Sequence, residues 1–404
     1  MRILHINCVY PGGSTGKITE SLHRALQQQG EESLVVYGRG RNCHQKDTVK
    51  ICSEFWGKAN NVISRMTGLV YGGCFWQTLR LTRFIRKFKP DIVHLQCING
   101  FFVNIYRLIS FLRDTGIPTV LTLHAEFMYT ANCGCSYGCG EWKNGCVHCP
   151  DFHKATGSWF LNRTAESSEK LKDAYTGFDQ RLTVVGVSQW LSSHASSSPL
   201  LGNAPTRTIY NGICTDQFYP RDPSGRKKQL GIQETQKVIL WVTSSFSTEK
   251  GVDYFWELSR RMQGEKYRFF VAGAEKPADY SGNVYFLGKI QNQAELAQAY
   301  SMADVSICCS RQESYPTVSI ESQCCGTPVV GFDVGGVRET IYRGMGEAVP
   351  LGDMDAMEKA VIYWAEQKPK IHRDVIAQCA LHHSEKRMTG EYIQLYHQIL
   401  ERQE

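Results

Sequence analysis

The sequence predicts an α/β protein with two domains, each built on a parallel sheet. Short apolar segments alternate with longer amphipathic segments, which is typical of strand–helix–strand units. This alternation stops at a polar, turn-rich stretch at 211–228 and then starts again. A chain of 404 residues is also too long for one hydrophobic core, so two domains of about 200 residues each are expected.

The individual strands follow from short apolar runs. The first half has candidate strands at Arg2–Asn7, Ser33–Gly38, Asp91–Gln96, Thr119–His124, Leu182–Ser188 and Thr206–Asn211. The second half has them at Lys237–Ser245, Tyr267–Gly273, Asn283–Gly288, Val305–Ser310 and Pro328–Phe332. Ligands of such sheets bind beyond the carboxyl ends of the strands, so we expect a site in a cleft between the domains.

Helices are predicted where apolar residues recur at a spacing of three and four. Lys17–Gly30 and Phe101–Thr115 have this spacing and a glycine near the end. From Gly390 to the last residue, Tyr392 and Tyr396 belong to an apolar stripe that must bury one face of a helix. The predicted boundaries are 1–215 and 216–385 for the domains and 386–404 for the final helix.

Composition indicates an ordinary soluble protein, with 42% hydrophobic and 21% charged residues. No run reaches the ~18 apolar residues needed to span a bilayer. The first residues have no signal-peptide pattern and predict a strand, so we expect a cytoplasmic protein. Its sixteen cysteines should then be thiols or metal ligands.

Positive charge is concentrated at the start of the chain. Residues 1–120 contain sixteen Lys and Arg and seven Asp and Glu, a net charge of +9, whereas the whole chain has +6. The stretch 78–90 interleaves cations with leucine, isoleucine and phenylalanine. It is either a helix with a solvated basic face or a surface for anionic lipid headgroups. No nucleic-acid-binding motif accompanies the charge, so nucleic acid is not an expected partner.

The segment 310–331 has the strongest functional pattern. A strand ends near Ser310, a loop contains Glu313, and a helix begins near Thr317 with Glu321 about one turn inside it. The free amides and positive dipole of a helix start suit a diphosphate. The two carboxylates can accept hydrogen bonds from sugar hydroxyls and from a ribose diol, although paired surface glutamates would look the same.

This segment resembles the E-x7-E signature of the retaining glycosyltransferases of family 4. Further matches occur in family order over nearly the whole chain: Pro11-Gly12-Gly13, Asn211-Gly212 with Phe218 and Pro220, Glu249-Lys250-Gly251, and Gly335-Gly336 with Glu339. The resemblance implies the GT-B fold, in which two Rossmann-like domains face each other across a cleft and the C-terminal helix crosses back to the N-terminal domain.

The resemblance also implies roles for individual residues. Glu313 would hold the donor sugar, Glu321 the ribose, and Lys250 the diphosphate. His124, at the end of the fourth strand, would be the cleft histidine near the sugar, although a buried core position is the alternative. The remaining implied donor-binding residues are Gly12, Gly13, Tyr315, Pro316, Thr317 and Val318.

These groups suit cleavage of the bond between an anomeric carbon and a diphosphate. Negative charge develops on the leaving group, and a lysine with oriented amides stabilises it, so no catalytic metal is expected. The chain departs from the family in having no arginine shortly before Lys250, where Arg311 or Arg338 could substitute. Ala125 also follows His124, where the family often has aspartate.

A cysteine-rich insertion at about 130–152 forms a second pattern. Cys133, Cys139, Cys146 and Cys149 have the spacing C-x5-C-x6-C-x2-C, and Cys135 is an additional member. Four thiolates would close a tetrahedral structural zinc site, whereas unligated thiols or a disulfide are the alternatives. Some polysaccharide-building members of the family contain a similar insertion, which would fix a loop on the acceptor side.

The expected function is therefore retaining transfer of a hexose-type sugar from a UDP- or GDP-sugar donor to a glycan or lipid-linked acceptor. The resemblance places this reaction in bacterial surface polysaccharide assembly, with possible contact to the inner face of the cytoplasmic membrane. One alternative keeps the fold but glycosylates a small molecule or a protein. Another is a non-catalytic two-domain sugar-binding protein.

Overall fold

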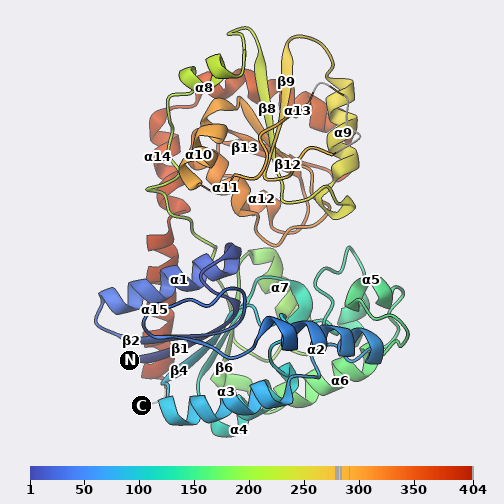
Figure 1. The fold of residues 1–404 in the computed structure, drawn as a ribbon, viewed down its shortest axis with the longest axis vertical. Helices are drawn as coiled ribbons and strands as arrows, with labels where there is room; N and C mark the ends of the chain where they lie inside the picture. Colours follow the sequence, from blue (N-terminus) through green and yellow to red (C-terminus); the bar gives the residue numbers. More distant parts are fainter. Residues whose placement is uncertain (278–281, 283, 291, 403–404) are drawn as a thin grey trace. The chain divides into compact units, whose positions relative to one another are not determined.

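The computed structural model describes residues 1–277, 282, 284–290 and 292–402 (Figure 1). The chain divides into two compact units. The N-terminal unit comprises Met1–Tyr210 and Thr389–Glu404, and the C-terminal unit comprises Asn211–Met388. Each unit is a parallel sheet with interleaved helices, which confirms the predicted fold class.

The N-terminal unit contains a seven-stranded sheet in the order β3-β2-β1-β4-β5-β6-β7, with every pair parallel. Its strands are β1 (Arg2–Val9), β2 (Glu32–Arg39), β3 (Thr48–Lys50), β4 (Ile92–Leu95), β5 (Thr119–Leu123), β6 (Leu182–Gly186) and β7 (Thr206–Thr208). Both faces are covered by helices, so β4, β5 and β6 are buried along their whole length. Of these seven strands, β3, a half-exposed edge strand of three residues, was not predicted.

Seven α-helices belong wholly to the N-terminal unit. They are α1 (Gly13–Gln28), α2 (Glu54–Thr67), α3 (Phe75–Phe88), α4 (Ile105–Thr115), α5 (Phe152–Thr156), α6 (Thr164–Tyr175) and α7 (Gln189–Ser197). Helix α4 begins four residues later than predicted because the Asn104 side chain caps it by accepting a hydrogen bond from the Arg107 N–H. Gly116, with φ +69°, ends it.

The C-terminal unit contains a six-stranded parallel sheet in the order β10-β9-β8-β11-β12-β13. Its strands are β8 (Lys237–Val242), β9 (Tyr267–Ala272), β10 (Val284–Phe286), β11 (Val305–Cys308), β12 (Val329–Phe332) and β13 (Gly346–Val349). The prediction began β10 at Asn283, which lies outside the described residues, and did not include β13. Trp241, Phe255 and Phe269 lie at the centre of the core on one side of the sheet.

The helices of the C-terminal unit connect these strands. They are α8 (Ser224–Gln229), α9 (Val252–Arg261), α10 (Gln293–Met302), α11 (Thr317–Cys324), α12 (Val337–Thr340), α13 (Met354–Gln367) and α14 (Arg373–His382). Helix α8 occupies the end of the stretch predicted as a linker. None of the helices within the described ranges has the length and apolar content that crossing a bilayer requires.

Counted from its own first strand, the C-terminal sheet has the order 3-2-1-4-5-6, and the N-terminal sheet has the same order with a seventh strand after the sixth. In this order the first three strands are added toward one side of the sheet and the later strands toward the other, starting again beside the first strand. Ligands bind beyond the carboxyl ends of the strands at that point. The relevant positions follow β1 and β4 in the N-terminal unit and β8 and β11 in the C-terminal unit.

The final helix, α15 (Glu385–Glu401), starts in the C-terminal unit and ends in the N-terminal unit. Tyr392 and Tyr396 are fully buried against the N-terminal sheet, as the apolar stripe predicted. The Tyr396 hydroxyl lies 2.6 Å from His94 Nδ1, and the Tyr392 hydroxyl lies 2.9 Å from Thr122 Oγ1. The chain therefore returns to its first unit, as the family resemblance implied.

Candidate active site

A lysine and a glutamate form an ion pair beyond the carboxyl ends of β8 and β11. Lys250 ends a short 3-10 helix (Thr248–Lys250) after β8, and Glu313 lies in the loop after β11. Because β8 and β11 are parallel neighbours, these two segments leave the same edge of the sheet. The Lys250 ammonium donates a hydrogen bond of 2.6 Å to Glu313 Oε1, and Ser310 Oγ donates to the same oxygen at 2.8 Å. The structure thus brings together two residues that are 63 positions apart in sequence.

Two glycines allow the backbone to pass close to this pair. Gly251 has φ +73°, and a Cβ there would lie 1.8 Å from the carbonyl oxygen of Cys309. Gly335 has φ +54°, and a Cβ there would lie 2.0 Å from the carbonyl oxygen of Glu313. The same carbonyl accepts a hydrogen bond from the N–H of Gly336. Only glycine fits such contacts in the left-handed region, which explains the Lys-Gly and Gly-Gly sequence patterns physically.

Helix α11 begins at Thr317, the predicted position. The first N–H groups of a helix have no carbonyl partner within it, and its dipole adds partial positive charge. Glu321 lies one turn inside, where its Oε2 accepts a hydrogen bond of 3.0 Å from the Tyr300 hydroxyl. Tyr300 is fully buried, so its hydroxyl fixes the direction of the Glu321 carboxylate.

The residues just before α11 have a different environment. Tyr315 is buried, and its hydroxyl lies 3.3 Å from His383 Nδ1 at the end of α14. Pro316 is also buried, whereas Thr317 and Val318 are half-buried. Tyr315 therefore anchors the loop to α14, while the start of α11 remains accessible.

Both arginines considered as additional cations are already paired with aspartates. Arg311 donates to both oxygens of Asp253 at 2.7 and 2.6 Å, and Arg338 donates to Asp333 at 2.6 Å. The hydrogen bond from Arg311 lowers the pKa of the Asp253 carboxyl. Lys250 is thus the cation that the structure pairs with a site carboxylate.

In the N-terminal unit, three predicted residues lie beyond the same edge of the sheet. Gly12 and Gly13 follow β1 and begin α1, and His124 follows β5. His124 Nε2 lies 2.7 Å from Oε1 of Gln96, which follows β4. Because an amide oxygen only accepts, Nε2 carries the proton and the lone pair is on Nδ1. Burial lowers the pKa of His124 to about 4, so the ring is neutral at neutral pH.

The structure adds supporting residues that sequence reasoning missed. Gln96 Nε2 lies 3.1 Å from His94 Nε2, which also lies 2.8 Å from Thr122 Oγ1. The other ring nitrogen of His94, Nδ1, contacts the Tyr396 hydroxyl. This buried polar network connects His124 to helix α15. In the sequence, Gln96 could have been noticed as a polar residue at the end of the strand predicted at Asp91–Gln96.

Glu126, two residues after His124, anchors the cysteine-rich insertion. It is buried and accepts hydrogen bonds from the Ser136 N–H at 2.5 Å, the Ser136 hydroxyl at 2.8 Å and the Tyr129 hydroxyl at 2.7 Å. Burial raises the pKa of Glu126, but hydrogen bonds from His194, Tyr129 and Ser136 outweigh it, so the net pKa is lowered. An ionised carboxylate therefore ties the insertion to the end of β5.

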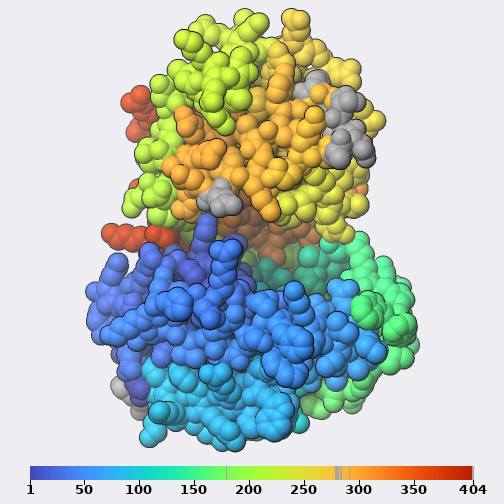
Figure 2. Space-filling model, in the orientation of Figure 1, coloured from blue at the N-terminus to red at the C-terminus, as the bar shows by residue number. Residues whose placement is uncertain are grey.

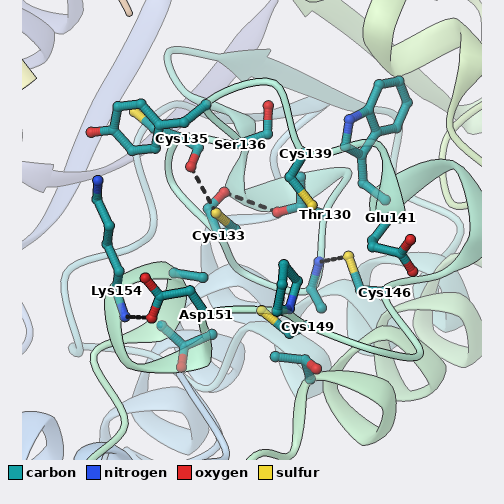
Figure 3. A pocket seen from close by; sticks show the side chains of 17 residues that line it. Thr130, Cys133, Cys135, Ser136, Cys139, Glu141, Cys146, Cys149, Asp151 and Lys154 are labelled. Atoms are coloured by element: carbon teal, nitrogen blue, oxygen red, sulfur yellow. Dashed lines mark hydrogen bonds between the residues drawn. The ribbon is translucent and has the colours of Figure 1, made fainter. Parts of the chain in front are cut away.

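The insertion lines most of an open cavity of about 230 Å³, to which residues 154–156 and Thr164 also contribute (Figure 3). All five of its cysteines line this cavity, and none of them forms a disulfide: Cys133, Cys135, Cys139, Cys146 and Cys149. Cys133 Sγ donates to the Cys135 carbonyl, and Cys146 Sγ accepts from the Ala131 N–H. Within the parts of the chain that the structure describes, no three His, Cys, Asp or Glu side chains are arranged to hold a metal ion. The predicted ligands thus share one cavity but do not converge.

Comparisons with known proteins agree with this fold. Residues 15–217 match the model of Glycosyltransferase Family 4, and residues 225–380 match that of Glycosyl transferases group 1. The chain is 23% identical to a putative colanic acid biosynthesis glycosyl transferase, WcaC, of Escherichia coli, over 99% of this chain and 100% of that protein.

Solved structures resemble the whole chain at low identity. Sucrose-phosphate synthase from Thermosynechococcus elongatus matches with a TM-score of 0.67 and 16% identity, over 99% of each chain. HepE from Anabaena, in complex with UDP-glucose, matches with a TM-score of 0.65 and 14% identity, over 98% of this chain and 99% of that one. From its family matches, strand order and neighbours, the chain belongs to glycosyltransferase family 4 and has the GT-B fold.

Proposed function

We propose that the protein transfers a hexose-type sugar from a UDP- or GDP-sugar to a glycan or lipid-linked saccharide, with retention, during assembly of a bacterial surface polysaccharide. The Lys250–Glu313 pair beside the start of α11 is the observation that carries this proposal. It combines a cation, a carboxylate and oriented amides at the point where α/β sheets bind ligands. HepE, of the same fold, binds UDP-glucose, and WcaC is named for colanic acid biosynthesis.

In this proposal the bound donor replaces the ion pair between Lys250 and Glu313 with separate contacts to each residue. The Lys250 ammonium moves from Glu313 to the diphosphate, whose other oxygens accept from the first amides of α11. Glu313 is then free to accept hydrogen bonds from sugar hydroxyls. Glu321, oriented by Tyr300, accepts from the ribose diol. The contacts of Lys250 and of the α11 amides strengthen as negative charge develops on the leaving diphosphate, so they stabilise the transition state more than the bound donor. The contacts of Glu313 and Glu321 hold the sugar and the ribose in position.

For the N-terminal unit we propose that the Gly12 and Gly13 amides contact the diphosphate and that His124 Nδ1 accepts from a donor hydroxyl. The acceptor oxygen would attack the anomeric carbon on the face that the diphosphate leaves. One C–O bond forms as the other breaks, and the acceptor proton passes to the departing phosphate oxygen. No protein nucleophile and no metal ion takes part in this sequence.

Isothermal titration with nucleoside diphosphates, followed by a screen of nucleotide-sugars for hydrolysis, tests the proposed function. Binding of UDP or GDP and release of nucleoside diphosphate from one donor are expected. A sugar-binding protein without catalysis would bind a free sugar and ignore the nucleotides. Extending the screen to small-molecule and protein acceptors decides the acceptor class.

Glu321→Ala is expected to weaken nucleoside diphosphate binding by about 10- to 100-fold, because it removes a charged acceptor of two hydrogen bonds. Tyr300→Phe leaves the carboxylate in place but removes its orienting hydroxyl, so a loss of about three- to tenfold is expected. Glu366→Ala, at an exposed carboxylate paired with Lys266, is the matched control and should leave the affinity unchanged. Equal affinities for all four proteins would rule out the assigned ribose contact.

For the insertion we propose a structural zinc ion bound by Cys133, Cys139, Cys146 and Cys149. The four thiols line one cavity, and the last two have the C-x2-C spacing of zinc knuckles. Binding would draw them inward from their present positions. A closed site of four thiolates leaves no position for water, so its role would be to hold the insertion together rather than to catalyse.

Metal analysis of protein purified without chelators should find one zinc per chain, and Cys146→Ser/Cys149→Ser should remove it and lower the melting temperature by several degrees. Cys43→Ser, at a partly buried cysteine elsewhere in the same unit, is the control. A zinc content well below one equivalent in the unmodified protein, with unchanged melting after chelation, would show that the cysteines are unligated thiols.

A further inference from the structure

Helix α2 exposes its apolar residues to solvent. Phe55, Val62 and Met66 are 72%, 44% and 52% exposed. With Ala59 they follow the spacing i, i+4, i+7, i+11, so they form one stripe along the helix. Such a stripe normally faces the core of a globular protein. In α2 the stripe faces solvent instead.

The buried side of α2 is made of small and polar residues. Gly57, Asn60 and Ser64 are the buried residues of this helix, and they lie on the side opposite the stripe. A Cβ at Gly57 would lie 2.7 Å from the Arg39 side chain, so the contact with the body of the unit is close. Packing against the unit therefore does not explain the apolar stripe.

The exposed apolar area continues onto two neighbouring segments. Asn60 Oδ1 accepts a hydrogen bond from the Cys74 N–H, which places the start of α3 beside α2. The Trp159 N–H donates to the Arg65 carbonyl at 2.8 Å, which places the 159–161 segment at the end of α2. The apolar surface, as we call it, comprises Phe55, Trp56, Val62, Ile63, Met66, Phe75, Trp76, Trp159, Phe160 and Leu161, each at least 44% exposed.

The two helices that contribute to this surface also expose positive charge. Residues 54–89 contain seven Lys and Arg but one acidic residue, Glu54. Glu54 is paired with Arg39, so it does not neutralise these cations. Lys58 and Arg65 are exposed on α2, and Arg80, Arg83, Arg86 and Lys87 are exposed on α3. Figure 2 shows both helices, in mid-blue and light blue, on the outside of the N-terminal unit.

Helix α3 contains most of the basic stretch 78–90, for which the sequence left a solvated basic face and a lipid-binding surface as alternatives. Its apolar residues Leu81 and Ile85 are buried, which confirms that this helix packs on the unit. They are therefore not available to a lipid, and the exposed apolar residues of α3 are Phe75 and Trp76 at its start. Half of the residues of the apolar surface come from α2, a helix not predicted from the sequence.

We propose that the apolar surface docks on an anionic phospholipid bilayer. Tryptophan prefers the membrane–water interface, and the surface contains three. The adjacent cations match lipid phosphates, whereas a protein partner of the same fit would need an acidic rim around an apolar centre. We expect this surface to enter the membrane–water interface without crossing the bilayer, with α2 lying in the plane of the membrane. This inference does not rest on the proposed function, because membrane binding needs neither donor nor acceptor.

Co-sedimentation with vesicles tests the proposal on the full chain. Binding to vesicles of phosphatidylcholine with phosphatidylglycerol is expected, with much weaker binding to phosphatidylcholine alone. Trp56→Ser/Trp76→Ser should lower the partition coefficient by about tenfold or more at any salt concentration. Arg80→Gln/Arg83→Gln/Lys87→Gln should lower it by about fivefold per charge, and this loss should shrink as salt is raised.

Tyr363→Ser, an exposed aromatic on α13 of the C-terminal unit, is the matched control and should bind as the unmodified protein does. Because all the substituted side chains are exposed, each variant should keep its melting temperature. Failure of the unmodified protein to bind anionic vesicles at low salt would overturn the proposal. So would self-association that Trp56→Ser/Trp76→Ser abolishes without vesicle binding, since the surface would then be occupied by a second copy.

Discussion

Replacing Lys250 with alanine is expected to lower the rate of sugar transfer by about 100- to 1000-fold, the typical cost of removing one group that stabilises transition-state charge. The structure gives a reason to expect the upper part of this range. Arg311 and Arg338, the other cations considered for the diphosphate, are engaged by Asp253 and Asp333. The measurement is release of nucleoside diphosphate in the presence of acceptor, at saturating donor.

Lys266→Ala is the matched control, because Lys266 is also paired with a glutamate but precedes β9, at the opposite edge of the sheet. It should retain full activity. Lys250→Arg should recover part of the rate, since it keeps the charge but changes its geometry. A rate within threefold of the unmodified enzyme for Lys250→Ala would contradict the assigned role, whatever the donor turns out to be.

Gly251→Ala is expected to destabilise the C-terminal unit by about 3 kcal/mol. An alanine must adopt the left-handed φ of +73°, and its Cβ would lie 1.8 Å from the Cys309 carbonyl oxygen, so the backbone must move. Because Lys250 is the preceding residue, this movement should also weaken nucleoside diphosphate binding. Urea unfolding and titration calorimetry on the same preparation measure the two effects.

Gly225→Ala provides the comparison within the same unit. Gly225 lies in helix α8, and a Cβ there would have no atom within 4 Å. The substitution should leave stability unchanged or raise it by up to about 1 kcal/mol, as in other helices. If both alanines have the same small effect on stability, the close approach of the Cys309 carbonyl does not restrict position 251 to glycine.

Much of the fold could be predicted because the sheets are parallel and buried. Strands such as β4 and β5 are short, mostly apolar runs, so their position is visible in the sequence. The edge strands β3 and β13 were missed because they are short and partly exposed, and their pairing depends on the neighbouring strand. Helix α2 was missed for another reason, namely that its apolar stripe points away from the core.

The candidate site was predictable only in part. Glu313, Glu321 and Lys250 lie in recognisable motifs. Lys250 and Glu313, which are far apart in sequence, come into contact because β8 and β11 are neighbouring strands. By contrast, no motif marks Gln96, His94 or Tyr300, which orient His124 and Glu321 through side-chain contacts across strands and helices. Such partners depend on the packing of segments far apart in the chain, so a single sequence cannot reveal them.

The course of α15 limits how relatives of this protein can be recombined. A chimera made by one crossover near residue 211 would combine the sheet of one parent with the last helix of another, and the tyrosines of that helix would meet a foreign His94 and Thr122. Two crossovers, one before Asn211 and one after Met388, keep the inherited partners together. Exchange of donor specificity among these enzymes therefore amounts to replacing an internal cassette rather than a terminal half.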